Sequence, residues 1–209
     1  MLEYSKLPLS WKRIFELEWQ SVCEGSKAIA AVIVSEDGEI LSEGRNMISE
    51  SFVPNPATAH AEVEAVRNLD ISKYPYPKQY VMYVGLEPCP MCMGTIVMGH
   101  IRNVVIAARD DFGGATDLLQ HSDFLRGKNM NIVWAEQYLG DIQRGMQTIR
   151  ELLYNKDADK LSRMLNDFSV YNAAGVRAAR QLVEENFLDS VDLSSFTASE
   201  IYNLLLHNL

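Results

Sequence analysis

The sequence predicts an α/β protein of three layers, in which helices cover both faces of a mixed five-stranded sheet and further helices follow the sheet. Up to about residue 155, short apolar strand-like segments alternate with segments of helical periodicity. Beyond residue 142 the pattern is helical throughout. The 47% share of hydrophobic residues suits a soluble globular chain with a sizeable core. We therefore expect a catalytic domain over residues 1–155 and a helical extension over residues 156–209.

The elements of the expected core follow the order α-β-β-α-β-α-β-α-β. They are helix 10–26, strand 28–34, strand 39–43, helix 58–69, strand 80–86, helix 89–99, strand 103–108, short helix 117–121 and strand 131–135. The first helix has apolar side chains at spacings of three and four, with Ser10 as its expected N-cap. The first two strands flank a turn that ends at Gly38, which is typical of a β-hairpin. The second helix carries an apolar stripe of Val63, Val66 and Leu69.

Loops separate the later elements. A polar, proline-bearing connection precedes the third strand, and a glycine-bearing loop over residues 109–116 follows the fourth. Four segments with helical periodicity come after the last strand. They are residues 143–155, 157–167, 173–186 and 198–208. We expect the first of these to complete the core and the others to form the extension, with a polar break over residues 189–195.

The charge of the chain restricts its partners. Nineteen basic against twenty-eight acidic residues give a net charge of −9, which is the wrong sign for a protein that binds by neutralising phosphates. No cluster of Lys and Arg indicates a local basic groove. Apolar segments are too short to span a bilayer, and the first residues do not resemble a signal peptide. With only three cysteines, we expect a cytoplasmic protein without disulfides or membrane contact, for which nucleic acid is an unlikely partner.

Two short motifs indicate the chemistry. His60-Ala61-Glu62 and Pro88-Cys89-Pro90-Met91-Cys92 together read H-x-E…P-C-x-x-C, the pattern of the zinc deaminases. One imidazole and two thiolates, from His60, Cys89 and Cys92, make three zinc ligands and leave a fourth tetrahedral position for water. The Glu62 carboxylate is then available as the catalytic proton carrier. We expect one zinc ion per chain and the hydrolytic release of ammonia from a carbon that bears an exocyclic amine.

The spacing within each motif predicts its place in the fold. Cys89 and Cys92 are three residues apart and share one face in the first turn of a helix, where free N–H groups favour thiolates. His60 and Glu62 are two residues apart and would diverge inside a helix, so we expect them at a helix N-terminus. Both motifs would then lie at the carboxyl edge of the sheet, where open α/β sheets bind ligands.

The motifs and the surrounding core resemble the cytidine deaminase-like superfamily, in particular the branch of guanine deaminases, cytosine deaminases and tRNA adenosine deaminases. The resemblance rests on residues 56–62, 87–94 and 108–110 and covers about residues 10–150. It implies that Asn46, in Gly44-Arg45-Asn46, hydrogen-bonds the substrate base, and that the backbone amide of Ala61 also contacts it.

Asp110 lies in a loop that leaves the carboxyl edge of the sheet, and we include it among the expected substrate contacts; a solvated glycine turn is the alternative interpretation. Asn55 stands where the family often has Asp, a difference that affects the loop rather than the chemistry. The helical extension has no counterpart in the minimal members of the family, so the resemblance implies nothing about it.

Three functions remain open. The first, which we favour, is a deaminase of a small nucleobase, nucleoside or related heterocycle, with guanine- or cytosine-like rings foremost. The second is a tRNA-specific adenosine deaminase, which residues 107–110 and 113–115 resemble but the acidic charge disfavours. The third is a non-catalytic zinc-stabilised binding scaffold, which would have no need of Glu62.

We also expect at least a homodimer. A helix face of Met91, Thr95, Ile96 and Met98, together with the apolar pair Phe52-Val53, offers more apolar surface than a single α/β layer buries. The family resemblance agrees, since such deaminases are usually dimers or tetramers. We expect the helical extension to cover the pocket, which would exclude a polymeric substrate.

Overall fold

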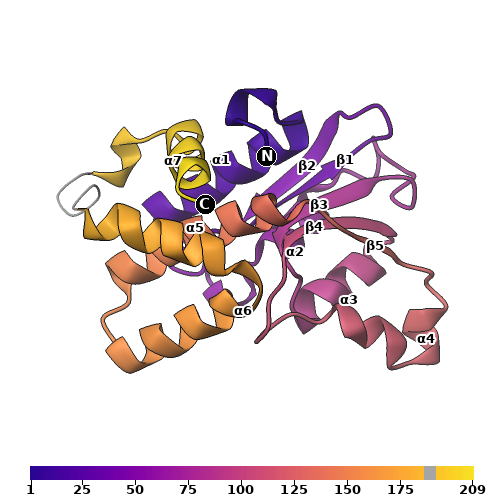
Figure 1. Ribbon diagram of the computed structural model, residues 1–209. Coiled ribbons are helices and arrows are strands. Elements are labelled where there is room, and N and C mark those ends of the chain that lie inside the picture. The colour runs from indigo at the N-terminus through magenta and orange to yellow at the C-terminus, as the bar shows by residue number, and fades with distance from the viewer. Residues whose placement is uncertain (186–191) are drawn as a thin grey trace.

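A mixed five-stranded sheet forms the centre of the protein (Figure 1), in a computed structural model that describes residues 1–185 and 192–209. The strands are β1 (Ala30–Val34), β2 (Ile40–Arg45), β3 (Val81–Leu86), β4 (Asn103–Ala108) and β5 (Asn131–Trp134). Their order is β2-β1-β3-β4-β5. Strand β1 is antiparallel to both β2 and β3, whereas β3, β4 and β5 run parallel. The predicted mixed sheet is therefore confirmed.

Helices cover both faces of this sheet. The helices of the described residues are α1 (Leu9–Cys23), α2 (Ala61–Asn68), α3 (Pro90–Met98), α4 (Asp123–Arg126), α5 (Gln137–Tyr154), α6 (Ala158–Glu184) and α7 (Ala198–His207). Short 3₁₀ helices lie at Tyr4–Lys6, Pro56–Thr58, Thr116–Gln120 and Leu193–Ser195. Helices α1, α5 and α7 share one hydrophobic core with the sheet, and α2 and α3 share a second core on the opposite face. This is the three-layer arrangement that the sequence predicts.

The alternation of side chains along β1 shows why both faces need helices. Every residue of this strand is buried. Ala30, Val32 and Val34 belong to the core with α1 and α5. Ala31 and Ile33 point the other way, into the core with α2 and α3. A strand that is apolar on both faces is stable only where both faces are covered.

Two predicted helix starts differ from the observed ones. Helix α1 begins at Leu9 with Pro8 as its N-cap residue, so Ser10 lies inside the helix, buried, and is not the cap. Helix α2 begins at Ala61 rather than at residue 58 or 59, because Pro56–Thr58 forms a separate 3₁₀ turn and His60 has the extended backbone of an N-cap. The prediction that His60 and Glu62 lie at a helix N-terminus is confirmed.

The helices after the sheet are longer than predicted. Helix α5 begins at Gln137, six residues before the predicted start, because Tyr138, Leu139 and Ile142 already pack on the sheet. The segments 157–167 and 173–186 belong to one element, α6, which bends at Asn172. The end of the second segment and residues 189–191 of the predicted polar break at 189–195 lie outside the described residues. The α4 helix was not predicted; its N-cap Ser122 accepts a hydrogen bond from Leu125 N.

The predicted boundary at residue 155 falls in the turn between α5 and α6, and it remains a prediction. The described part of the extension packs on the main core. The ring of Tyr202 in α7 meets Phe15 of α1 edge-on at 5.0 Å between centroids, and its hydroxyl donates to Leu2 O at 2.9 Å. The two ends of the chain lie side by side for this reason (Figure 1). None of the helices in the described ranges has the length and apolar character needed to cross a bilayer.

One carboxyl group is buried in the core without a partner. Glu18 of α1 is fully buried against Gly85 of β3, and neither of its side-chain oxygens is hydrogen-bonded within the described chain. A Cβ atom at position 85 would lie 1.7 Å from Glu18 Oε1, so this glycine makes room for the carboxyl. Burial raises the pKa of Glu18 well above its ordinary value, and the positive charge of Arg144 opposes the shift. The protonated form is therefore favoured in the folded state.

We predict that Glu18→Gln stabilises the protein increasingly as pH rises. Above the ordinary carboxyl pKa the unfolded chain releases this proton while the folded chain keeps it, so the wild type loses stability up to the raised folded pKa. Each pH unit of that interval changes the free energy of unfolding by about 1.4 kcal/mol. Urea unfolding of both proteins from about pH 5 to about pH 8 measures the difference. Parallel stability curves would contradict the prediction.

Candidate metal centre and substrate cavity

Three side chains meet at the carboxyl edge of the sheet. His60 is the N-cap of α2, Cys89 is the N-cap of α3, and Cys92 lies in the first turn of α3. Their donor atoms form a nearly equilateral triangle: His60 Nδ1 lies 3.6 Å from Cys89 Sγ and 3.5 Å from Cys92 Sγ, and the two sulfurs are 3.5 Å apart. These residues form the one cluster of potential metal ligands among the described residues.

The triangle fits zinc. With Zn–S near 2.3 Å and Zn–N near 2.0–2.1 Å, tetrahedral ligands lie roughly 3.4–3.8 Å from one another. All three observed separations agree with this range. The set of two thiols and one imidazole is also a usual zinc set, and three protein ligands leave one position open, as in catalytic rather than structural sites. His60, Cys89 and Cys92 thus form the zinc-binding triad that the sequence predicts.

The two thiols of the triad influence each other's pKa. The Cys89 and Cys92 sulfurs lie within hydrogen-bond distance, at 3.5 Å, and this contact lowers the pKa of Cys89 to about 4, with a further contribution from His60. The same hydrogen bond and burial raise the pKa of Cys92. The lowered pKa of Cys89 favours its thiolate, the form in which cysteine binds zinc.

The triad opens into a cavity of about 480 Å³. His60, Cys89 and Glu62 line one part of it, Asn46 and Ile29 another, and the first half of α6 closes it with a group of side chains. These are Lys160, Arg163, Met164, Asp167 and Phe168. The helical extension therefore contributes side chains to the cavity wall, and it lies over the pocket as we expected from the sequence.

Glu62 and Asn46 are both buried and both line the cavity. The carboxylate of Glu62 accepts from the Cys92 thiol at 3.2 Å, so it lies beside the triad, and burial raises its pKa. The side-chain oxygen of Asn46 accepts from Lys27 N and Ile48 N, both at 3.3 Å. Its amide group, which has no hydrogen bond within the described chain, is thereby left as a donor.

Ala61 and Asp110 occupy different positions relative to the cavity. Ala61 is the first residue of α2 and its side chain is fully buried, so only its backbone amide is suited to contact a ligand. Asp110 lines the cavity and accepts from Arg144 NH2 at 3.0 Å. The loop after β4 is further held by Glu87, which accepts from Asp110 N at 3.2 Å and from the Thr116 hydroxyl at 2.5 Å.

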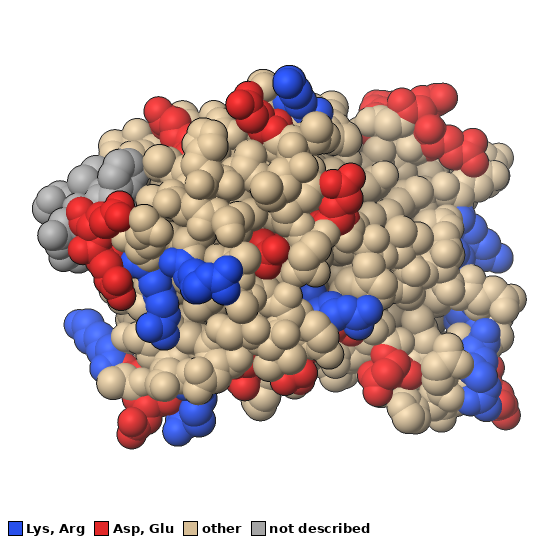
Figure 2. Space-filling view, in the orientation of Figure 1, with Lys and Arg blue, Asp and Glu red and all other residues tan. Residues whose placement is uncertain are grey.

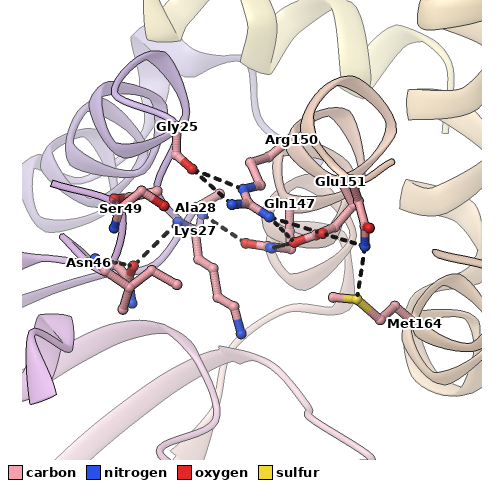
Figure 3. Close-up of polar contacts among 12 residues, drawn as sticks. Gly25, Lys27, Ala28, Asn46, Ser49, Gln147, Arg150, Glu151 and Met164 are labelled. Carbon is pink, nitrogen blue, oxygen red and sulfur yellow. Dashed lines mark hydrogen bonds and ion pairs between the residues drawn. The ribbon is translucent and has the colours of Figure 1, made fainter. Parts of the chain in front are cut away.

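A buried polar network supports the cavity from α5 (Figure 3). Gln147 accepts from Ala28 N at 2.7 Å and donates to Glu151 Oε1 at 2.6 Å. Arg150 donates to Gly25 O at 2.9 Å and pairs with Glu151. The network thereby fixes the loop over residues 25–28, from which the Lys27 side chain extends away with its amino group joined to none of the residues drawn.

Sequence reasoning missed the contributions of α5 and α6. Arg144 and Gln147 line the cavity although they lie far from either motif. Arg144 is almost fully buried, with its guanidinium over the ring of Phe168 at 4.3 Å and its Nε without a partner in the described chain. The available signal was a polar stripe on a helix that also carries the buried apolar residues Leu139, Ile142, Met146 and Ile149. The stripe consists of Gln143, Arg144, Gln147, Thr148 and Glu151.

The sequence was compared with protein families and with individual proteins. Residues 9–164 match the model of the MafB19-like deaminases. A tRNA-specific adenosine deaminase of Haemophilus influenzae is 37% identical over 102 residues, which are 48% of this chain and 57% of that protein. A guanine deaminase of Bacillus subtilis is 35% identical over 98 residues, 46% of this chain and 61% of that protein. The aligned regions therefore span little more than half of these relatives.

Solved structures support the fold. The guanine deaminase of Nitrosomonas europaea aligns with a TM-score of 0.52 at 18% identity, over 68% of this chain and 83% of that one. A solved complex with 2,6-diaminopurine aligns with a TM-score of 0.54, also at 18% identity, over 71% of this chain and 82% of that one. At such identity the likeness shows a common fold.

We predict that Cys89→Ser and Cys92→Ser each reduce bound zinc from about one ion per chain to nearly none, because two protein ligands hold zinc weakly. Metal analysis of the purified proteins measures the stoichiometry. Cys23→Ser is the matched control, since Cys23 is the third cysteine and lies outside the triad. Chelation of the wild type should also lower its melting temperature, because the metal joins the N-termini of α2 and α3. Full zinc content in either ligand variant would show that the assigned triad is wrong.

Proposed function

Because the chain belongs to the MafB19-like deaminase family and carries an intact His-Cys-Cys zinc triad, we propose that it deaminates a small nucleobase, nucleoside or related heterocycle. Guanine- and cytosine-like rings are the first candidates. The observation that carries this proposal is the cavity, in which the triad and Glu62 share a space that α6 closes from the opposite side. Such a space suits a small ring that is enclosed on most sides.

The proposed reaction replaces an amine by a carbonyl. Zinc held by His60, Cys89 and Cys92 would supply a water molecule of lowered pKa. Glu62 takes a proton from the attacking water, delivers it to a ring nitrogen, and then passes the second proton to the amine. The carbon–nitrogen bond breaks, and the amine leaves as ammonia. The buried position of Glu62 beside the triad suits this role, because proton transfer requires a carboxylate within hydrogen-bond reach of both partners.

Other residues would orient the ring. We propose that the side-chain N–H of Asn46 donates a hydrogen bond to an acceptor on the edge of the heterocycle. The backbone N–H of Ala61 would donate to a second acceptor on the ring. Asp110 contributes through the cavity wall, where its ion pair with Arg144 fixes the loop after β4. Ile29 and Leu86 supply apolar walls for the ring faces.

The second candidate is a tRNA-specific adenosine deaminase. Relatives with that name and a guanine deaminase reach similar identities, 37% and 35%. Charge argues against RNA, because a net charge of −9 repels a polyanion. On the face drawn in Figure 2, acidic and basic side chains are interspersed and no continuous basic surface is seen. A binding scaffold is a weaker third candidate, since it would not need a buried carboxylate beside the metal ligands.

We predict that the zinc-loaded protein releases ammonia from at least one small heterocycle. Ammonia is measured with a panel of free bases, nucleosides and a tRNA transcript. Glu62→Gln should lower kcat by at least about a hundredfold with zinc content and melting temperature retained, because the amide cannot carry protons. Conversion of a single adenosine in tRNA, with no activity on small compounds, would establish the second candidate. Near-normal turnover by Glu62→Gln would refute the role given to this residue.

We further propose that the protein is a homodimer through the surface around α3. Met98 of α3 and Phe52 in the loop before α2 are 65% and 71% exposed, which is unusual for such large apolar side chains. Ile96, which the sequence analysis placed on the same surface, is instead fully buried in the core beneath α3. Family resemblance to dimers and tetramers supports the proposal.

Light scattering at micromolar concentration should give the mass of a dimer, and Met98→Asp should shift it toward that of the monomer. Leu9→Asp is the matched control, because Leu9 is also exposed, at 62%, but belongs to α1 on the opposite side of the sheet. A monomeric wild type, or equal effects of both substitutions, would contradict a dimer through α3.

A further inference from the structure

Three basic side chains surround the cavity without a partner. Lys27, Lys160 and Arg163 all line it, and none of the three side chains makes a hydrogen bond or ion pair within the described part of the chain. Several other arginines of this protein are paired, among them Arg45 with Glu50, Arg144 with Asp110, and Arg150 with Glu151, whereas the exposed Arg177 and Arg180 are not paired within the described residues. In a chain of net charge −9, unpaired cations around one cavity indicate a ligand of opposite charge.

Two of these cations, Lys160 and Arg163, lie on the first half of α6 and line the cavity. Lys160, Arg163 and Asp167 follow the spacing of one helix face, and all three line the cavity. Lys160 and Arg163 are the two basic residues between the start of α6 and its bend at Asn172. If the ligand were purely apolar, we would expect only apolar side chains on the cavity face of α6, such as those of Met164 and Phe168. The two cations need another explanation.

Lys27 approaches the cavity from the opposite wall, on a rigid backbone. Its N–H donates to Asn46 Oδ1 at 3.3 Å, and the next residue donates to Gln147 at 2.7 Å. Its side chain is free to extend from this fixed loop (Figure 3). The backbone of Lys27 is therefore bonded to the residue that we assign to the heterocycle, and its side chain lines the same cavity as the cations of α6.

Acidic residues of the cavity do not cancel this charge. Glu62 lies at the triad, Glu87 is held by Thr116 and the backbone of the loop, and Asp110 is paired with Arg144. Asp167 remains as the one anion on the cavity face of α6, and its negative charge also acts on Arg144. Three unpaired cations against Asp167 leave a positive excess around the cavity.

On this basis, and resting on the proposed deaminase function, we propose that the substrate carries a phosphate group, as a nucleoside 5′-monophosphate does, and that Lys27, Lys160 and Arg163 bind this phosphate. The ring would lie at Asn46 and the triad, and the sugar would bridge to α6. A cavity of about 480 Å³ belongs to the size class that takes ligands larger than a bare ring. A free nucleotide is favoured over RNA because the cations are confined to one cavity.

The test is binding to the zinc-loaded Glu62→Gln protein, which holds substrate without turnover. Calorimetry gives Kd for adenosine, guanosine and cytidine and for each 5′-monophosphate. The ratio of the two Kd values measures the contribution of the phosphate. We expect the matching monophosphate to bind about tenfold more tightly than its nucleoside, as two or three solvent-accessible ion pairs provide. The advantage should shrink as salt is added.

Variants of α6 provide the matched comparison. Lys160→Ala/Arg163→Ala should reduce the ratio to near one. Arg177→Ala/Arg180→Ala removes the same charge, at the same spacing, from exposed positions of the same helix that do not line the cavity, and should keep the ratio. Lys27→Met, which retains the backbone contacts of this loop, should lower the ratio independently. Melting temperatures verify that each variant is folded.

The outcomes separate the two proposals. If bases or nucleosides are deaminated but phosphate gives no advantage, or both α6 pairs have equal effects, the phosphate site is refuted and the deaminase function stands. If no member of the panel binds or releases ammonia, both proposals fail. Tight binding and deamination of an RNA hairpin, with no binding of monophosphates, would overturn the nucleotide proposal in favour of a tRNA substrate.

Discussion

The arrangement of this protein depends on the convergence of two helix N-termini at one edge of the sheet. His60 and Cys89 are both N-cap residues, so the backbone leaves an extended segment and enters a helix at each of them. At such a junction the side chain points along the helix axis toward whatever lies beyond the end of the helix. Two junctions that face the same point bring the ligands within 3.6 Å of one another, although they lie 29 residues apart in the chain. The free N–H groups of both first turns add positive potential where thiolates and substrate oxygens gather.

Close packing between these two helices maintains the convergence. Gly44 of β2 allows α2 to lie directly on the sheet, since a Cβ there would come within 2.2 Å of Ala61 O. Gly99, at the end of α3, likewise allows Val66 of α2 to approach, at 2.7 Å from the place of a Cβ. Small residues thus fix the two helices relative to the sheet and to each other. The triad is a property of this packing as much as of its own three residues.

Local sequence was sufficient to predict the sheet, most of the helices and the triad, because each depends on neighbours in the chain. The five strands follow from short apolar segments, and the ligands follow from their spacing at helix starts. The part of the cavity formed by α5 and α6 depends on contacts between residues far apart in the chain, so it could not be predicted from local sequence. Arg144, Gln147 and Lys160 reach the cavity only because α5 crosses the sheet and α6 folds back on α5. The bend at Asn172 also depends on a distant partner, since this side chain donates to Asp141 at 3.1 Å.

The contact between the first and last helices has a consequence for the order in which the protein folds. Tyr202 packs edge-on against Phe15 and Tyr4, nearly two hundred residues earlier in the chain, and Tyr4 N donates to Asn203 Oδ1. During synthesis, the part of α1 that packs against α7 must therefore stay exposed until α7 leaves the ribosome. Such long-range closure slows folding and leaves apolar surface exposed meanwhile. A nascent chain of this protein would complete this core only after α7 has been synthesised.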